Sequence, residues 1–253
     1  MKKTILLSIG GVLMAAGLVL LGVWISKNLD QWNAGKDYED LKVEFDVEPL
    51  VDVPQADTGP VEVPIDFEEL QKQYPDIYAW IRIPGTVIDY PILQREGDNS
   101  YYLNHTYQGK KKTEGAIYTE DYNSKDFLDP NTVIYGHNMK NGSMFKALHK
   151  YKNRTFFDEH SEIIIYQKGK ILTYKIFAAY TSDAKHLLLS YDFDDENVFS
   201  NYLNNVLTNS NKSSNINITI PVSSEDRIIT LSTCNNNDAQ RYLVQAVLLS
   251  IQE

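Results

Sequence analysis

The chain has 253 residues and a formal net charge of −10, from 24 lysines and arginines against 34 aspartates and glutamates. With 43% hydrophobic residues it can bury the core of one sizeable domain, and its acidic balance excludes electrostatic attraction of nucleic acid or anionic lipid. Its single cysteine, Cys234, excludes an intramolecular disulfide and any Cys-x-x-Cys zinc or redox motif.

An uncharged and mostly apolar run occupies residues 4–26, behind Lys2 and Lys3. At about 1.5 Å per residue, a helix of this length would cross a ~30 Å hydrocarbon core. The two lysines favour a cytoplasmic N-terminus, so we expect a single-pass membrane protein in which residues 1–27 form the cytoplasmic tip and signal anchor. A cleaved signal peptide is the alternative, but the run is long and Val23-Trp24-Ile25 at its end is a poor cleavage site.

Residues 28–65 are acidic, and their prolines include Pro54, Pro60 and Pro64. Their scattered apolar positions are too few to bury a core, so we expect an acidic extracellular tether. Asp66 is then an N-cap candidate, followed by two acids in the first turn, and the helical pattern stops before Pro75. A short helix therefore opens the folded domain, which we expect to span residues 66–253.

Short stretches rich in β-branched and aromatic residues alternate with turn signals along the rest of the chain. They predict strands near residues 79–83, 87–93, 115–118, 132–135, 162–166, 171–177, 227–234 and 241–251. Apolar residues at helical spacing from Val198 to Leu207, behind three acids, predict one amphipathic helix before the penultimate strand. Many short strands with few helices favour a barrel or sandwich over a parallel α/β sheet.

Cys234 ends the strand predicted near 227–234 and precedes four polar residues. Its thiol is therefore expected at the edge of the domain, where the strand meets a solvent-facing loop. The alternative is a buried structural cysteine, a role that a strand interior would suit better. His137 sits at a similar junction, behind the strand at 132–135. A thiolate nucleophile needs a basic neighbour that can later protonate a leaving amine, and imidazole suits both tasks.

Arg241 opens the last predicted strand, just beyond the polar loop that follows Cys234. An antiparallel hairpin would return it to the neighbourhood of the thiol, where a guanidinium could stabilise an oxyanion. A strand-edge arginine in solvent is the alternative. The other four histidines are expected to be surface or hydrogen-bonded core residues, and no His, Cys or Asp cluster has metal-ligand spacing, so no metal or cofactor is expected.

Several motifs occur together in this chain: residues 78–81, 85–91, 98–103 and 131–139, Met144-Phe145, and Thr230-Leu231-Ser232-Thr233-Cys234 with an arginine behind it. In these motifs the sequence resembles the class B sortases, membrane-anchored cysteine transpeptidases of Gram-positive bacteria, over roughly residues 66–251. The resemblance implies a mainly β fold, an eight-stranded barrel with a few peripheral helices. Those helices include one at the N-terminus of the domain and a longer one before the penultimate strand.

The same resemblance implies a mechanism. Cys234 would be the nucleophile, His137 the general acid and base, and Arg241 the group that holds the oxyanion and orients the substrate. The groove that binds the substrate would be lined by Asn99, Leu103, Tyr135 and Ser232. Such an enzyme, a cysteine endopeptidase in its first step, cleaves a C-terminal sorting motif of secreted proteins after Thr. It forms a thioester and passes the acyl group to an amine of a peptidoglycan precursor or cell-wall peptide.

Two other functions stay open. A Cys/His cell-wall peptidase fits poorly, since papain-like enzymes place Cys before His with the Cys opening a helix, the reverse of His137 and Cys234. L,D-transpeptidases carry Gly before the Cys, where this chain has Thr233. A non-catalytic, surface-anchored binding module is the third possibility, and an unreactive Cys234 would favour it.

Overall fold

The computed structural model describes residues 2–47, 61–208, 214–235 and 239–253. The helices are α1 (Lys2–Asn33), α2 (Lys36–Glu44), α3 (Phe67–Gln73), α4 (Arg154–Glu159), α5 (Leu187–Ser190) and α6 (Glu196–Leu207), with 3₁₀ helices η1 (Tyr101–Leu103) and η2 (Phe145–Lys152). The strands are β1 (Ile77–Arg82), β2 (Asp89–Leu93), β3 (Ile117–Thr119), β4 (Asn131–Tyr135), β5 (Glu162–Gln167), β6 (Lys170–Asp183), β7 (Asn215–Ile216), β8 (Ile228–Cys234) and β9 (Gln240–Gln252). Each predicted strand is present, and β6 runs further than its pattern suggested.

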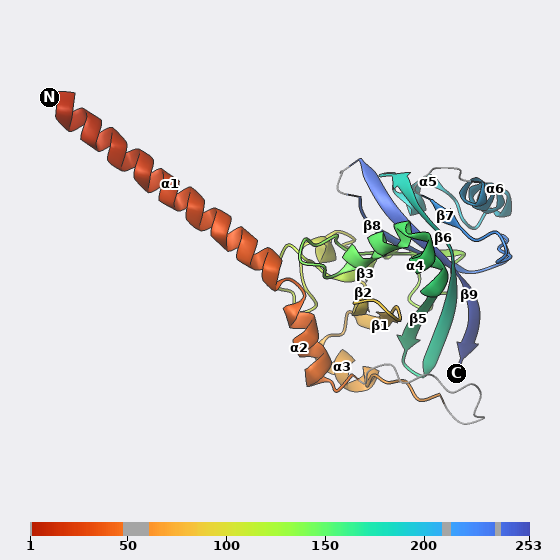
Figure 1. Ribbon diagram of the computed structural model, residues 1–253. Coiled ribbons are helices and arrows are strands. Elements are labelled where there is room, and N and C mark those ends of the chain that lie inside the picture. Colours follow the sequence, from red (N-terminus) through yellow and green to blue (C-terminus); the bar gives the residue numbers. More distant parts are fainter. Residues whose placement is uncertain (1, 48–60, 209–213, 236–238) are drawn as a thin grey trace.

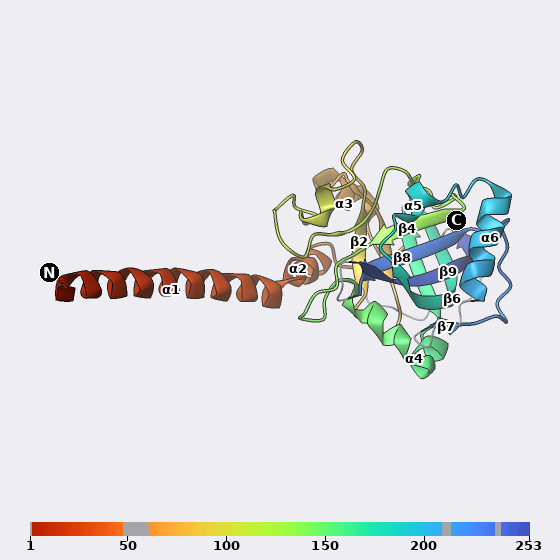
Figure 2. The same ribbon diagram turned by 90° about the horizontal axis from the view of Figure 1, so that it is seen from above.

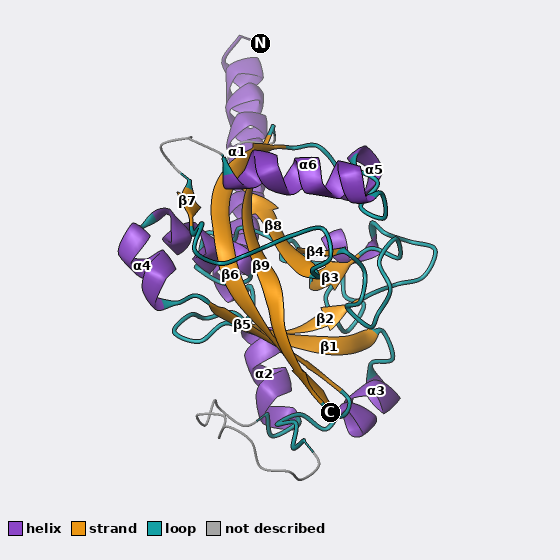
Figure 3. Cartoon of the chain, turned by 90° about the vertical axis from the view of Figure 1, so that its right-hand side faces the viewer, coloured by secondary structure: helices purple, strands orange, loops and turns teal. Residues whose placement is uncertain are grey.

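The strands form one closed barrel. Their order is β5-β1-β2-β3-β4-β8-β9-β6, and the pairing of β5 with β6 joins the two ends of this series (Figure 3). The short strand β7 adds to the outer side of β6. Closure removes the unpaired strand edges that an open sheet would expose. The predicted eight-stranded barrel with peripheral helices is therefore confirmed.

Two helices follow their sequence signals closely. Helix α3 begins where the Asp66 side chain accepts a hydrogen bond from the Glu69 backbone N–H, at 3.0 Å. Helix α6 is capped in the same way by Asp195, and its apolar stripe is buried against β6 and β9 (Figure 2). Phe199 and Leu203 of that stripe pack in one cluster with Phe177 of β6. The apolar repeat in the sequence thus marked a second core, on the outside of the barrel.

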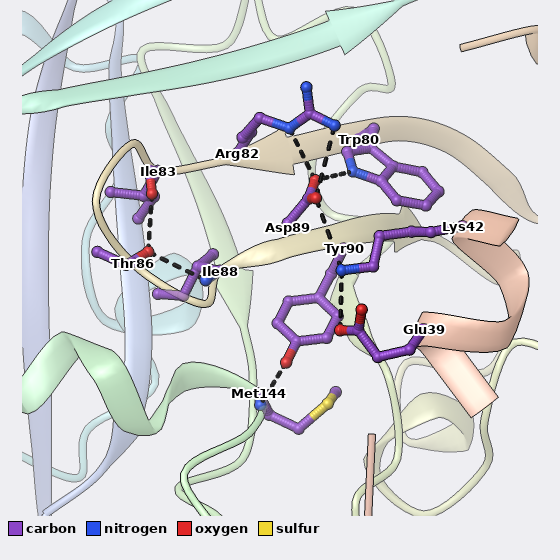
Figure 4. Close-up of polar contacts among 10 residues, drawn as sticks. All are labelled: Glu39, Lys42, Trp80, Arg82, Ile83, Thr86, Ile88, Asp89, Tyr90 and Met144. Atoms are coloured by element: carbon purple, nitrogen blue, oxygen red, sulfur yellow. Dashed lines mark hydrogen bonds and ion pairs between the residues drawn. The ribbon is translucent and has the colours of Figure 1, made fainter. Parts of the chain in front are cut away.

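The segment before the barrel differs from the tether that its composition suggests. Helix α2 packs on the domain with Tyr38 and Leu41 fully buried, and the Tyr38 hydroxyl donates to the Gly115 carbonyl at 2.6 Å. Lys42 of the same helix lies 3.6 Å from the Asp89 carboxylate (Figure 4). Because only one face of this short acidic helix is apolar, averaged composition hides it. Residues 48–60 of the expected tether lie outside the described residues, and the domain boundary at residue 66 stays a prediction.

Helix α1 projects away from the barrel as a long rod (Figure 1). In the part of the chain that the structure describes, no helix is long and apolar enough to cross a membrane. This finding contradicts the predicted membrane anchor at 4–26, and with it the cytoplasmic N-terminus and the extracellular placement of the domain.

Candidate active site

Cys234 is the last residue of β8, and its thiol is free. Every residue of β8 before it is buried, and Cys234 itself is half-buried where the polar loop begins. In the antiparallel pairing of β8 with β9, Cys234 lies directly opposite Arg241. The hairpin expected from the sequence is therefore present, and it sets the arginine beside the cysteine.

His137 reaches the same edge of the barrel by a different route. Strand β4 runs parallel to β8, with Tyr135 opposite Ser232, so both strands end at one edge and His137 follows there. The backbone N–H of Gly136 donates to the Ser232 carbonyl at 3.1 Å. A Cβ on Gly136 would lie 2.5 Å from the Ile117 side chain and 2.7 Å from the Phe145 ring, so a larger residue would displace these side chains or the histidine loop.

Cys234, His137 and Arg241 line one groove with a volume of about 190 Å³. Three of the four predicted substrate-binding residues, Leu103, Tyr135 and Ser232, also line it. The predicted triad and most of the predicted groove thus converge in space, although they come from four separate segments of the chain.

The fourth predicted groove residue, Asn99, differs from the expectation because it is not among the groove-lining residues. Its side chain is occupied by Asp121: the Asn99 amide donates to the carboxylate at 2.6 Å and accepts from the Asp121 backbone N–H at 2.7 Å. The Gly97 N–H and the Asn99 amide hold the pKa of Asp121 below its usual value. Asn99 therefore holds the loop before η1 against the loop that follows β3.

The proton on His137 can be placed from its neighbour. The ring nitrogen Nε2 lies 2.7 Å from the Leu103 carbonyl oxygen. Because a carbonyl only accepts, Nε2 carries the proton and donates, which leaves Nδ1 as the nitrogen that can take up or release a proton. A histidine held in this way can serve as an acid or a base without reorienting.

A match to the Sortase domain family covers residues 81–249. Sortase B of Listeria monocytogenes is 37% identical over 243 residues, which are 92% of this chain and 95% of that protein. The chain belongs to the sortase family, class B. It is accordingly a cysteine transpeptidase in general terms, which leaves the binding module and the Cys/His peptidase without support.

Solved class B sortases share the fold of this sortase. The structure of B. anthracis sortase B in complex with AAEK1 superposes with a TM-score of 0.70 at 27% identity, over 88% of this chain and 99% of that one. A Staphylococcus aureus sortase B–substrate complex matches with a TM-score of 0.64 at 30% identity, over 73% and 84%. The barrel found in this sortase is therefore the fold of its relatives.

Sequence reasoning missed a second polar pair on the groove of this sortase. His186, which caps α5, lines the groove, and its Nε2 lies 2.8 Å from a carboxylate oxygen of Glu120. The Glu120 side chain is 12% exposed and that of His186 32%. No local pattern marks this pair, because Glu120 follows β3 and His186 comes 66 residues later. The sequence placed His186 only in a loop.

Two tyrosines beside this pair remain neutral phenols. Burial, and after it the negative charge of Glu120, raises the pKa of Tyr135 well above its ordinary value. Burial and Glu120 do the same for the pKa of Tyr118, and the Arg241 guanidinium opposes the shift. Both tyrosines line the groove, so their rings offer a substrate an apolar face but no base.

Proposed function

We propose that Cys234 is the nucleophile of this sortase, His137 its general acid and base, and Arg241 the cation that holds the oxyanion and orients the peptide. The observation that carries the proposal is the shared groove: Arg241 lies opposite Cys234 on the neighbouring strand, and His137 follows the strand on the other side. The hydrogen bond from His137 Nε2 to Leu103 supports the role of Nδ1 in proton transfer.

The chemistry divides into two halves. The Cys234 thiolate attacks the carbonyl carbon of a peptide bond, and the negative charge that develops on the oxygen is stabilised by Arg241. As the C–N bond breaks, protonated His137 gives its proton to the leaving amine, and an acyl thioester remains on Cys234. An incoming amine then loses a proton to His137 and attacks the thioester, which forms the new amide and returns the thiolate.

The substrate that we propose is a C-terminal sorting motif of a secreted protein, cleaved after Thr, and the acceptor is an amine of a cell-wall peptide or its precursor. The S. aureus sortase B–substrate complex among the similar structures supports a peptide substrate in this groove. The groove has the mixed lining that such a peptide needs, with Leu103 and Leu187 as apolar contacts and Ser232 as a polar one.

Intact mass spectrometry of the full chain with a panel of sorting-motif peptides tests this function. We expect the mass of the N-terminal peptide fragment to appear on wild-type protein, and to move to an added peptide amine. A Cys234→Ala variant should show neither. The proposal fails if folded wild-type protein gives no adduct and no cleavage, and its thiol also resists alkylating reagents.

A further inference from the structure

The backbone carbonyl of Cys234 accepts two hydrogen bonds, both from side chains. The Asn138 amide donates to it at 3.0 Å, and His149 Nε2 lies at 3.1 Å. A carbonyl oxygen has two lone pairs, so these two donors satisfy it fully. Both come from the segment that carries His137: Asn138 is the next residue, and His149 lies on η2 shortly behind it. The strand end that carries the thiol is thereby tied to the histidine loop.

The Asn138 bond continues the β4–β8 ladder beyond its last backbone bond. That last bond runs from the Gly136 N–H to the Ser232 carbonyl. In a parallel ladder the next donor lies two residues on, at residue 138, and the next acceptor is the Cys234 carbonyl. By then the chain has left β4 and pairs with Met144 instead, and the Asn138 side chain supplies the donor. His137 is therefore flanked on each side by a bond to β8.

His149 approaches the same carbonyl from the other side. Its ring stacks on Tyr242, with centroids 5.1 Å apart and an angle of 30° between the planes. Because the carbonyl only accepts, Nε2 carries the proton, and within the described residues Nδ1 has no hydrogen-bond partner. Burial, helped by repulsion from Lys152, lowers the pKa of His149, so the ring stays neutral near pH 7. His149 does not line the groove, which separates its role from that of His137.

We propose that Asn138 and His149 are positioning residues that together hold the Cys234 carbonyl, and so keep the thiol at a fixed distance from His137. The inference rests on the proposed function, in which Cys234 and His137 exchange a proton. Neither residue touches the reacting atoms. They act by keeping two strand ends in register, and small displacements of reacting groups carry a large cost in rate.

Matched variants in the full chain test the two donors separately. Asn138→Ala removes the amide, and His149→Phe keeps a ring over Tyr242 but removes the N–H. His149→Gln restores a donor near the position of Nε2. We expect Asn138→Ala and His149→Phe each to lower kcat for peptide cleavage about tenfold with KM changed by less than about twofold, and His149→Gln to recover most of the loss. The thermal midpoint of each variant is measured beside the rates.

Two results would overturn the positioning role: a kcat within about twofold of wild type in both donor-less variants, or a loss in His149→Phe that His149→Gln does not recover. If Asn138→Ala fails to fold, the comparison of His149→Phe with His149→Gln tests the positioning role by itself. Alkylation of Cys234 by iodoacetamide needs no substrate, so it still reports if none of the tested peptides is cleaved, whereas a wild-type thiol that resists alkylation refutes the proposed function itself. Equal alkylation rates in wild type and His149→Phe would then refute the inference, whereas a severalfold slower rate in the variant would support it.

Discussion

Two pairs of a carboxylate and a basic side chain, one on the β1–β2 hairpin and one at the groove, differ in what surrounds them. On the β1–β2 hairpin, Asp89 accepts from Arg82 Nε at 2.9 Å and from Trp80 Nε1 at 2.7 Å (Figure 4). Arg82 is 4% exposed, and it lies directly opposite Asp89 in the strand register. At the groove, Glu120 and His186 form the second pair, with His186 facing open space.

The difference shows how burial and partner number separate structural pairs from functional ones. A carboxylate that binds a buried cation contributes to stability, because losing it leaves that cation without an acceptor. A pair on the wall of a groove has weaker Coulomb attraction, since water screens it, but its polar atoms remain within reach of a ligand. The first pair should therefore respond to mutation in stability and the second in substrate binding.

The largest effect is expected at the groove itself, at Arg241. Arg241→Ala should lower kcat about 10²- to 10³-fold, because a group aimed at the developing oxyanion acts only in the transition state. Arg241→Lys should recover little of this, since an ammonium lacks the planar fork of a guanidinium. Steady-state cleavage of a sorting-motif peptide measures both. A lysine variant with full activity would show that charge alone suffices.

At the hairpin pair the change should appear in stability instead. Asp89→Ala should lower the free energy of unfolding by about 3 kcal/mol, because it leaves the buried Arg82 without its carboxylate. Asp89→Asn keeps an acceptor for Trp80 and should lose less. Urea unfolding gives the values, and kcat of the folded variant should stay near that of wild type. A loss below about 1 kcal/mol would remove the contrast between the two pairs.

At the groove pair the expected effect is smaller and falls on substrate binding. His186→Gln removes the imidazole but keeps a hydrogen-bond donor for Glu120, so unfolding should change by less than about 1 kcal/mol. We expect KM for sorting-motif peptides to rise about fivefold, as for the loss of one contact between the imidazole and the bound peptide, with kcat nearly constant. A variant whose stability falls while its KM stays unchanged would make this pair structural like the first.

The smallest effect concerns pH. The pKa of His149 is lower in the folded chain than the 6.5 of a free histidine, mainly because the ring is half-buried. Below about pH 6.5 the unfolded chain therefore binds more protons at this site than the folded chain does. The contribution of His149 to stability consequently decreases as the pH decreases below about 6.5, and it is constant at higher pH. His149→Phe should flatten that acid slope in urea unfolding measured from pH 7 to 5. An unchanged slope would assign the acid sensitivity to other groups.

Local pattern was enough to place most of the barrel. The strands, the Asp66 and Asp195 caps and the buried stripe of α6 follow from alternation, capping and helical spacing, which depend on near neighbours in the chain. The same logic set Cys234, His137 and Arg241 at strand ends, and strand topology brought those ends together. Their convergence on one groove was therefore foreseeable, whereas their catalytic roles remain a proposal.

The sequence by itself determined the barrel strands, the two capped helices α3 and α6, and where the chain carries its only thiol. Tertiary structure alone decided that α2 docks on the barrel, that Asn99 binds Asp121 outside the groove lining, and that Glu120 meets His186. The membrane span expected at 4–26 is contradicted as well, because no helix within the described residues is long and apolar enough to cross a membrane. The physical reason is distance along the chain. Propensity and periodicity act over a few residues, but the hydrogen bond from Asn138 to the Cys234 carbonyl joins positions 96 residues apart. Only the closed barrel brings such positions together.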